Sequence, residues 1–180
     1  MTRVAVLGAG AWGTAIACVL ALRLEVVLWA RDAAQARVIA RERRNERYLP
    51  GIELPASLRV SADFTESVAG AALALAATPV AGLREVSRRL GTAAPVIWLC
   101  KGFEEGSGAL PHQIVEQTLG AQARCGALSG PSFAQEVAHN LPCAVTLAAR
   151  DAAFARQAAS LLHGGRLRVY YSADLVGVEV

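Results

Sequence analysis

A glycine-rich turn follows an apolar segment near the N-terminus. Residues 4–7 are apolar, and residues 8–13 read Gly-Ala-Gly-Ala-Trp-Gly, ahead of a helix-prone segment. In such a pattern Gly8 permits a tight turn, Gly10 leaves room for phosphates, and Gly13 lets the helix lie close to the sheet. The helix N-terminus offers free amides and a positive dipole end to an anion. We therefore predict a dinucleotide site here, with a βα turn that binds no ligand as the alternative.

A second candidate for chemistry is a single amine. Lysine and arginine together number 18, and Lys101 is the only lysine. Its ammonium is a compact charge on a flexible stem that reaches into a small site, whereas arginine is planar and always protonated. We interpret Lys101 as a functional residue, and an incidental surface lysine is the alternative.

The end of the second apolar segment indicates which dinucleotide binds. An acidic residue there suits the ribose hydroxyls of NAD, and an arginine suits the 2′-phosphate of NADP. The chain has Arg31 followed by Asp32 at this point. We therefore predict NADP or NAD as cofactor, with NADPH favoured, and a solvated pair at a helix start as the alternative.

Composition excludes several classes of protein. Hydrophobic residues make up 54% of the chain and its mean hydropathy is +0.36, which suits strands buried on both faces. We expect no transmembrane segment, because no apolar run approaches the ~20 residues that span a bilayer. No signal peptide is expected either, so we predict a cytoplasmic location. The net charge is +3 with scattered arginines, so we expect no nucleic-acid partner. The four cysteines lack metal spacing, and we expect reduced core thiols and no metal site.

Apolar runs alternate with helical patterns along the chain. We expect strands near 3–7, 25–30, 72–77, 95–100, 124–128, 142–149 and 166–171. We expect helices near 13–22, 33–47, 80–90, 110–119, 132–139 and 151–163. The segment 41–67 reads as a solvated helix end and an irregular connection, with one short strand near 58–60. The alternation predicts an α/β fold of the Rossmann type, a doubly wound, mostly parallel sheet with helices on both faces, in one domain over 1–180.

The C-terminal residues predict one more short helix. Ser172 and Asp174 are candidate caps, and the apolar segment that follows stops at Val180 after about two turns. Such a helix has nothing to pack against in this reading. We therefore expect that the chain is truncated.

Several longer segments resemble bacterial NAD(P)-dependent glycerol-3-phosphate dehydrogenase, in order and along the whole chain. They are the glycine turn with Thr-Ala at 8–15, Trp-Ala-Arg at 29–31, Asn45 with Tyr-Leu-Pro at 48–50, Pro79, Trp-Leu-Cys-Lys-Gly-Phe at 98–103, Leu-Ser-Gly-Pro-Ser-Phe-Ala-Gln-Glu-Val at 128–137, and Asp174 with Gly-Val-Glu at 177–179. The segments around 101 and 130 are more specific than the glycine turn. The resemblance implies reversible, NAD(P)H-dependent reduction of dihydroxyacetone phosphate to sn-glycerol 3-phosphate, a step of glycerophospholipid synthesis.

The resemblance also assigns roles to individual residues. Beside Gly8, Gly10 and Gly13 of the predicted turn, it implies cofactor contacts by Trp12, Arg31, Tyr48, Lys101 and, near the nicotinamide, Ala134. It implies substrate contacts by Lys101, Gly130 and Ser132. A phosphorylated triose needs a cation and hydroxyl or backbone donors, which agrees with these assignments. Helix capping by Ser129 and Ser132 is the alternative.

The resemblance places the proton acceptor outside this chain. In the family it is a second lysine, in a Gly-Gly-Ala-x-Lys-Asn segment a few residues beyond the position of Val180. The helical substrate domain is expected there too, so we expect no catalytic base within 1–180 and an inactive fragment. For His112, His139 and His163 we expect surface or capping roles. We leave open whether the full-length protein forms a homodimer.

Two other functions remain at this point. One is a stand-alone NADP(H)-binding or sensing module that performs no chemistry. The other is the cofactor domain of a related dehydrogenase that acts on a hydroxy acid or a sugar phosphate, because a fold does not choose its substrate.

Overall fold

Strands and helices alternate along the chain, and the computed structural model describes residues 1–180. The main sheet contains β1 (Arg3–Leu7), β2 (Glu25–Trp29), β5 (Arg59–Ser61), β6 (Leu73–Ala76), β7 (Val96–Trp98), β8 (Cys125–Ser129), β9 (Cys143–Ala148) and β10 (Leu167–Ser172). The helices are α1 (Ala11–Ala21), α2 (Ala33–Glu42), α3 (Phe64–Val68), α4 (Val80–Leu90), α5 (Pro111–Leu119), α6 (Ala134–Ala138), α7 (Ala152–Leu162) and α8 (Leu175–Glu179). None of these helices has the length and apolar composition needed to cross a membrane.

The sheet is doubly wound around β1. Its strand order is β10-β9-β8-β7-β6-β1-β2-β5, so the chain moves outward through β2 and β5 and then returns to the other side of β1. All neighbouring strands pair in parallel except β8 and β9, which are antiparallel. The predicted fold class is therefore confirmed. The reversal of winding between β1 and β6 is the place where such sheets bind ligands.

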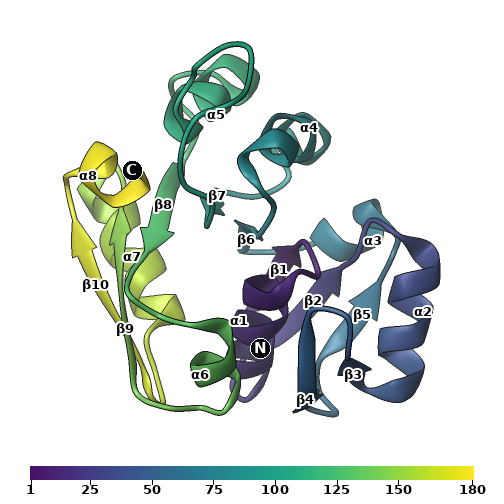
Figure 1. Cartoon of the computed structure of the whole chain (residues 1–180). Coiled ribbons are helices and arrows are strands. Elements are labelled where there is room, and N and C mark those ends of the chain that lie inside the picture. The colour runs from purple at the N-terminus through teal and green to yellow at the C-terminus, as the bar shows by residue number, and fades with distance from the viewer.

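Alternate side chains of the strands point into two separate apolar layers. Val4 and Val6 belong to one buried cluster, together with residues of α1, α2, α6 and α7. Ala5 and Leu7 belong to the other, together with residues of α3, α4, α5 and α8. The period of two within β1 explains why its run is apolar throughout. In Figure 1, α4 and α5 lie together over one face and α1 lies on the other.

The segment 41–67 is more ordered than expected. The helix predicted over 33–47 ends at Glu42, because Arg43 adopts a left-handed conformation with φ 54°. A hairpin of β3 (Arg44–Asn45) and β4 (Leu49–Glu53) replaces the irregular connection, and α3 was not predicted. The short strand expected near 58–60 is present as β5. The helix expected over 132–139 is shorter, since α6 has only five residues.

The C-terminal helix exists as predicted, but the expectation that it has nothing to pack against is wrong. Asp174 caps α8 by accepting a hydrogen bond from the Gly177 amide at 2.9 Å. The helix lies against β8 and β9, where Leu175 and the side chain of Glu179 are buried. The packing partner is the part of the sheet beyond β7, which the local pattern does not reveal.

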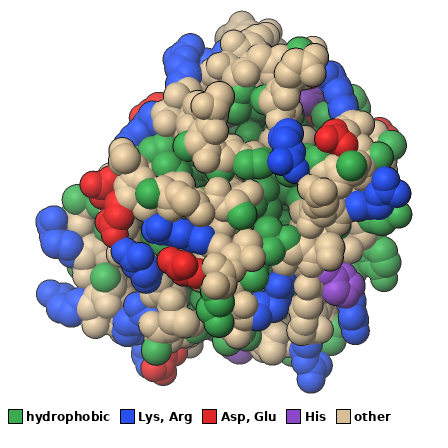
Figure 2. Space-filling view, turned by 180° about the vertical axis from the view of Figure 1, so that it is seen from behind, with side chains coloured by type: hydrophobic (Ala, Val, Ile, Leu, Met, Phe, Trp, Pro, Cys, Tyr) green, Lys and Arg blue, Asp and Glu red, His purple; other side chains and the backbone are tan.

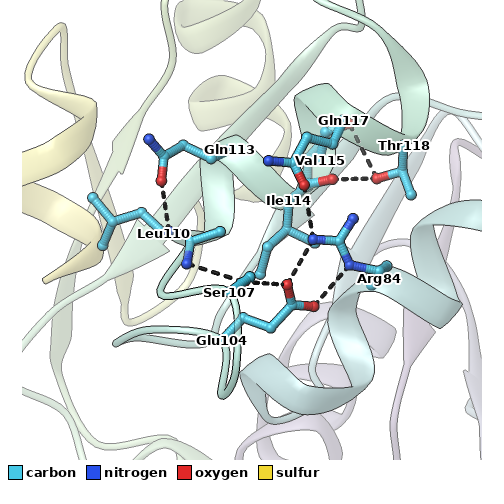
Figure 3. A network of polar contacts seen from close by, with 10 residues as sticks. Arg84, Glu104, Ser107, Leu110, Gln113, Ile114, Val115, Gln117 and Thr118 are labelled. Atoms are coloured by element: carbon cyan, nitrogen blue, oxygen red, sulfur yellow. Dashed lines mark hydrogen bonds and ion pairs between the residues drawn. The ribbon is translucent and has the colours of Figure 1, made fainter.

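An ion pair fastens the loop that follows β7. The Arg84 guanidinium on α4 donates to both carboxylate oxygens of Glu104, at 2.8 and 2.6 Å, and to Gln117 Oε1 on α5 at 2.8 Å (Figure 3). The Ser107 hydroxyl donates to the same carboxylate at 2.7 Å. These hydrogen bonds, Arg84 first, lower the pKa of Glu104 to about 2. The loop that carries Lys101 is therefore tied to α4 and α5.

Charged side chains do not gather into one basic patch on the face of the molecule opposite to that of Figure 1. Lysine and arginine side chains are scattered over this face, both at its rim and nearer its middle, and hydrophobic side chains lie in a hollow near the middle (Figure 2).

Replacing Glu104 by Gln should destabilise the protein in a pH-dependent way. Because the pKa of Glu104 is lowered from 4.5 to about 2, its stabilisation is fully present above about pH 4.5 and is lost as the pH falls through about 2. Thermal unfolding should therefore show a lower Tm for Glu104→Gln at pH 7 and a difference that shrinks below pH 4.5. An equal difference at pH 7 and pH 2.5 would contradict this role of the ion pair.

Candidate cofactor site

Glycine occupies the three positions of the first turn for different physical reasons. Gly8 has φ +129°, and a Cβ there would lie 2.4 Å from the Ala77 carbonyl oxygen. A Cβ on Gly13 would lie 2.0 Å from the Gly8 carbonyl oxygen, so only glycine lets α1 approach the turn. A Cβ on Gly10 would meet no atom within 4 Å. The roles predicted for Gly8 and Gly13 are thus required by the packing, and the space above Gly10 is open for a ligand.

A cleft of about 640 Å³ opens at the reversal of winding. Its lining comes from the residues that follow β1, β2 and β6, from the start of α4 and from the β3–β4 hairpin: Gly8, Ala9, Gly10, Trp29, Arg31, Asp32, Gln35, Arg47, Tyr48, Ala77, Thr78, Pro79, Ala81, Gly82, Glu85 and Val86. Four of the predicted cofactor residues are therefore brought to one cleft. Because α1 begins at Ala11 with no side-chain cap, its first amides face this region without an intrahelical partner.

Arg31 and Asp32 have different neighbours. Asp32 Oδ1 accepts from the backbone amides of Ala34 at 2.8 Å and Gln35 at 3.3 Å, so this carboxylate caps α2. Asp32 therefore fits the alternative given above, a residue at the start of a helix. Arg31 lines the cleft, is exposed and makes no hydrogen bond or ion pair with the protein. Its guanidinium is available to an anion.

The hairpin adds Arg47, which the sequence did not single out, and gives Asn45 a structural role. Asn45 is almost fully buried, and its amide donates to the Ala9 carbonyl at 2.9 Å and to Thr14 Oγ1 at 2.8 Å. It holds the hairpin against the glycine turn, where the Arg47 guanidinium stacks 5.1 Å from the centre of the Tyr48 ring. The only sequence signal was the place of Asn45 ahead of Tyr-Leu-Pro.

Thr78 is another lining residue that the sequence did not single out. Its Oγ1 is buried and has no hydrogen-bond partner in the protein. A buried hydroxyl without a partner is uncommon in a folded protein, because leaving it unpaired costs free energy. The open space above Gly10, the free Arg31 and this hydroxyl together fit a bound dinucleotide.

A second group of predicted residues gathers beside α1. Trp12 Nε1 donates to the Ser132 carbonyl at 3.2 Å, and α6, which begins at Ala134, packs on α1. Ser132 Oγ is buried without a partner. The capping alternative is wrong, because the N-cap of α6 is Phe133 and no side chain caps the helix.

Gly130 is constrained by the neighbouring strand. A Cβ there would lie 2.8 Å from the Ala144 carbonyl oxygen and 2.9 Å from Val145 Cα, both on β9. The small size of this residue therefore has a packing reason, beside the substrate contact that we expect.

Lys101 lies in the loop after β7 and does not line the cleft. Its side chain is exposed, and Nζ lies 3.5 Å from the Val180 carbonyl oxygen. Gly130 and Ser132, which follow β8, do not line the cleft either. The strands β2, β1, β6, β7 and β8 are all parallel, so these three residues and the cleft share the carboxyl edge of the sheet.

The histidines divide into two kinds. His139 and His163 are exposed at the C-caps of α6 and α7, as expected. The expectation for His112 is wrong, because this residue is buried in the first turn of α5 and its ring bonds the carboxylate of Glu179. The two residues are 67 positions apart in the sequence, so no local pattern reveals their contact.

None of the four cysteines is paired with another, but only Cys18 lies in the core as expected, since Cys100, Cys125 and Cys143 are half-buried. Burial raises the pKa of Cys18 and Cys125 to about 11 and that of Cys100 to about 12, so these thiols stay protonated at neutral pH. No group of three or more His, Cys, Asp or Glu residues is arranged to hold a metal ion.

Comparison with known proteins identifies the family. Residues 3–155 match the model of the "NAD-dependent glycerol-3-phosphate dehydrogenase N-terminus" family. The chain belongs to this family. The predicted resemblance to this family is therefore confirmed.

Individual relatives agree with the family model. Proteins named glycerol-3-phosphate dehydrogenase [NAD(P)+] from Dechloromonas aromatica and Aromatoleum aromaticum are each 54% identical over 181 residues, which cover 99% of this chain. The crystal structure of glycerol-3-phosphate dehydrogenase from Coxiella burnetii is 38% identical with a TM-score of 0.91, over 99% of this chain and 56% of that one. The chain spans about 55% of the length of the curated relatives that it matches.

Gly10→Val should impair cofactor binding, whereas Gly13→Val should impair stability. Gly10→Val adds atoms to open space, so the protein should fold normally but lose NADPH binding even at millimolar cofactor. Gly13→Val forces a Cβ into the Gly8 carbonyl, and we expect it to lower the free energy of unfolding by about 1–3 kcal/mol. Chemical denaturation and NADPH fluorescence titration measure the two properties. Normal binding by Gly10→Val would show that the phosphates lie elsewhere.

Proposed function

We propose that this chain is the cofactor-binding part of an oxidoreductase that reduces dihydroxyacetone phosphate to sn-glycerol 3-phosphate with NADPH or NADH, and catalyses the reverse reaction. The observation that carries the proposal is the cleft at the reversal of winding, where Gly10 faces open space and α1 points its first amides. The substrate follows from the names of the relatives. A bound nicotinamide supplies the hydride.

The proposed cofactor residues contact different parts of the dinucleotide. The pyrophosphate lies over Gly10 at the N-terminus of α1, where backbone amides and the helix dipole favour an anion. Arg31 and Tyr48 meet the adenine ribose, and the second cation at Arg47 adds positive charge there. NADPH is favoured because Arg31 is unpaired, whereas the nearby carboxylate of Asp32 caps α2.

The nicotinamide end lies beside Trp12 and Ala134, close to the substrate residues. Lys101 contacts both substrate and cofactor with its ammonium. Ser132 offers a hydroxyl that the protein leaves without a partner, and Gly130 lets its loop approach the substrate. A cation and a hydroxyl are the donors that a phosphorylated triose requires.

The rest of the reaction needs groups from outside residues 1–180. The proton acceptor is a lysine in a segment that follows this one, and a helical domain forms the other wall of the substrate site. The whole protein works in the cytoplasm and supplies glycerophospholipid synthesis.

Loss of the Arg31 charge should weaken NADPH selectively. A charge-assisted contact to the 2′-phosphate contributes about 1.5–3 kcal/mol, so Arg31→Ala should raise the Kd of NADPH roughly ten- to a hundredfold and that of NADH much less. Arg37→Ala is the matched control, because Arg37 is exposed on α2 and does not line the cleft. Calorimetric titration measures both cofactors. An equal loss for NADPH and NADH would mean that Arg31 does not contact the 2′-phosphate.

Residues 1–180 should bind NADPH but not turn over substrate. Hydride removal from a secondary alcohol needs a base within reach of the hydroxyl, and loss of a general base costs roughly 10²- to 10⁴-fold in rate. NADPH absorbance with dihydroxyacetone phosphate should decay only with the protein extended to the length of its relatives, and Lys101→Ala should reduce that rate. Binding without turnover by the extended protein would support a sensing module, and preference for another hydroxy acid or sugar phosphate would support a related dehydrogenase. Robust turnover by residues 1–180 would place the base within them.

A further inference from the structure

A buried carboxylate joins α8 to the first turn of α5. The side chain of Glu179 is fully buried, and its Oε2 accepts from the backbone amide of His112 at 3.0 Å. Its other oxygen bonds to His112 Nδ1. A buried charge is tolerated where hydrogen bonds satisfy it, and the N-terminus of a helix favours an anion. The carboxylate of Glu179 therefore acts as a cap that α5 receives from a distant part of the chain.

The same end of α8 contacts the loop that carries the only lysine. The Gly102 amide donates to the Glu179 carbonyl at 3.3 Å, and Lys101 Nζ donates to the Val180 carbonyl at 3.5 Å. The side chain of Glu179 thus holds α5 while its main chain holds Gly102. After burial, which has the larger effect, the charge of Glu179 also raises the pKa of Cys100, the residue before Lys101.

A lysine on a flexible stem needs partners to point in one direction. Its four-carbon chain has many rotamers, and fixing them costs entropy that a contact must offset. The Val180 carbonyl is the acceptor that the ammonium of Lys101 finds in this structure. The place of that carbonyl depends on the last turn of α8, and the last turn depends on Glu179.

We infer that Glu179 and His112 are positioning residues that direct the Lys101 ammonium toward the substrate. This inference rests on the proposed role of Lys101 in the dehydrogenase reaction. The pair acts through α8: the buried carboxylate fixes the position of Glu179, and the main-chain carbonyls of Glu179 and Val180 accept from the Gly102 amide and the Lys101 ammonium.

Because Lys101 is the only lysine, its side chain can be observed alone. Reductive methylation with ¹³C-formaldehyde labels Lys101 and the N-terminal amine, which gives two resolved methyl signals in a ¹H–¹³C spectrum. We would compare the unmodified sequence with Glu179→Gln and His112→Ala. Glu116→Gln is the matched control, because Glu116 also lies on α5 but pairs with Arg150.

Both variants should move the Lys101 signal toward that of free dimethyl-lysine. Exchange of the Gly102 amide should become about fivefold faster or more, as expected for loss of one hydrogen bond. The Glu116→Gln control should leave both readouts unchanged. An unchanged Lys101 signal in a folded Glu179→Gln or His112→Ala variant would overturn the inference. Failure of both variants to fold would overturn it as well, because the pair would then serve the fold itself.

Enzyme kinetics separates this inference from the proposed function. In the protein extended to the length of its relatives, Glu179→Gln should raise KM for dihydroxyacetone phosphate and lower kcat/KM about ten- to a hundredfold through misplacement of the amine. The Kd of NADPH for the same variant should rise less than KM does, since the pair lies outside the cofactor cleft and Lys101 is only one of several proposed cofactor contacts. If Lys101→Met leaves turnover unchanged, the proposed role of Lys101 fails, whatever the methyl signal shows. If Lys101→Met abolishes turnover and Glu179→Gln does not alter KM or kcat, the positioning role fails alone.

Discussion

The close contact of α1 with the turn that precedes it is the constraint on which the rest of the site depends. The contact exists because neither Gly8 nor Gly13 has a side chain, and each would otherwise meet a backbone oxygen. It brings the N-terminus of α1 to the carboxyl edge of β1, beside the loop after β6. The cleft, its free amides and the open space above Gly10 all follow from this approach.

The alternation of strands and helices could be predicted from the sequence because each element carries its own hydrophobic period. β1 and α4 are examples, since both lie within one residue of the expected bounds. The β3–β4 hairpin could not be predicted, because its charged residues suit a helix and its stability comes from the contact of Asn45 with the turn at residue 9. The buried contact between His112 and Glu179 could not be predicted for the same reason, because a contact between distant elements has no local sequence signal.

The candidate site was predictable to a similar degree. The glycine turn and Arg31 have a fixed place in a βαβ unit, so the sequence places them in the cleft. Thr78 and Arg47 have no such place, and they are found there because the loop after β6 and the hairpin fold over the same edge. Lys101 and Ser132 follow the next two strands along this edge. Along the carboxyl edge of the sheet, the cofactor cleft therefore lies at β2, β1 and β6, and the residues expected to contact the substrate follow β7 and β8.

The neighbouring roles of Arg31 and Asp32 have an evolutionary consequence. The residue that caps α2 and the residue that faces the cleft are adjacent, yet they are separate side chains. A change at position 31 leaves the Asp32 cap in place, so the charge at the cleft can vary without loss of α2. Under the proposed contact of Arg31 with the ribose, a single substitution would then alter the choice of nicotinamide cofactor without a compensating mutation in the scaffold.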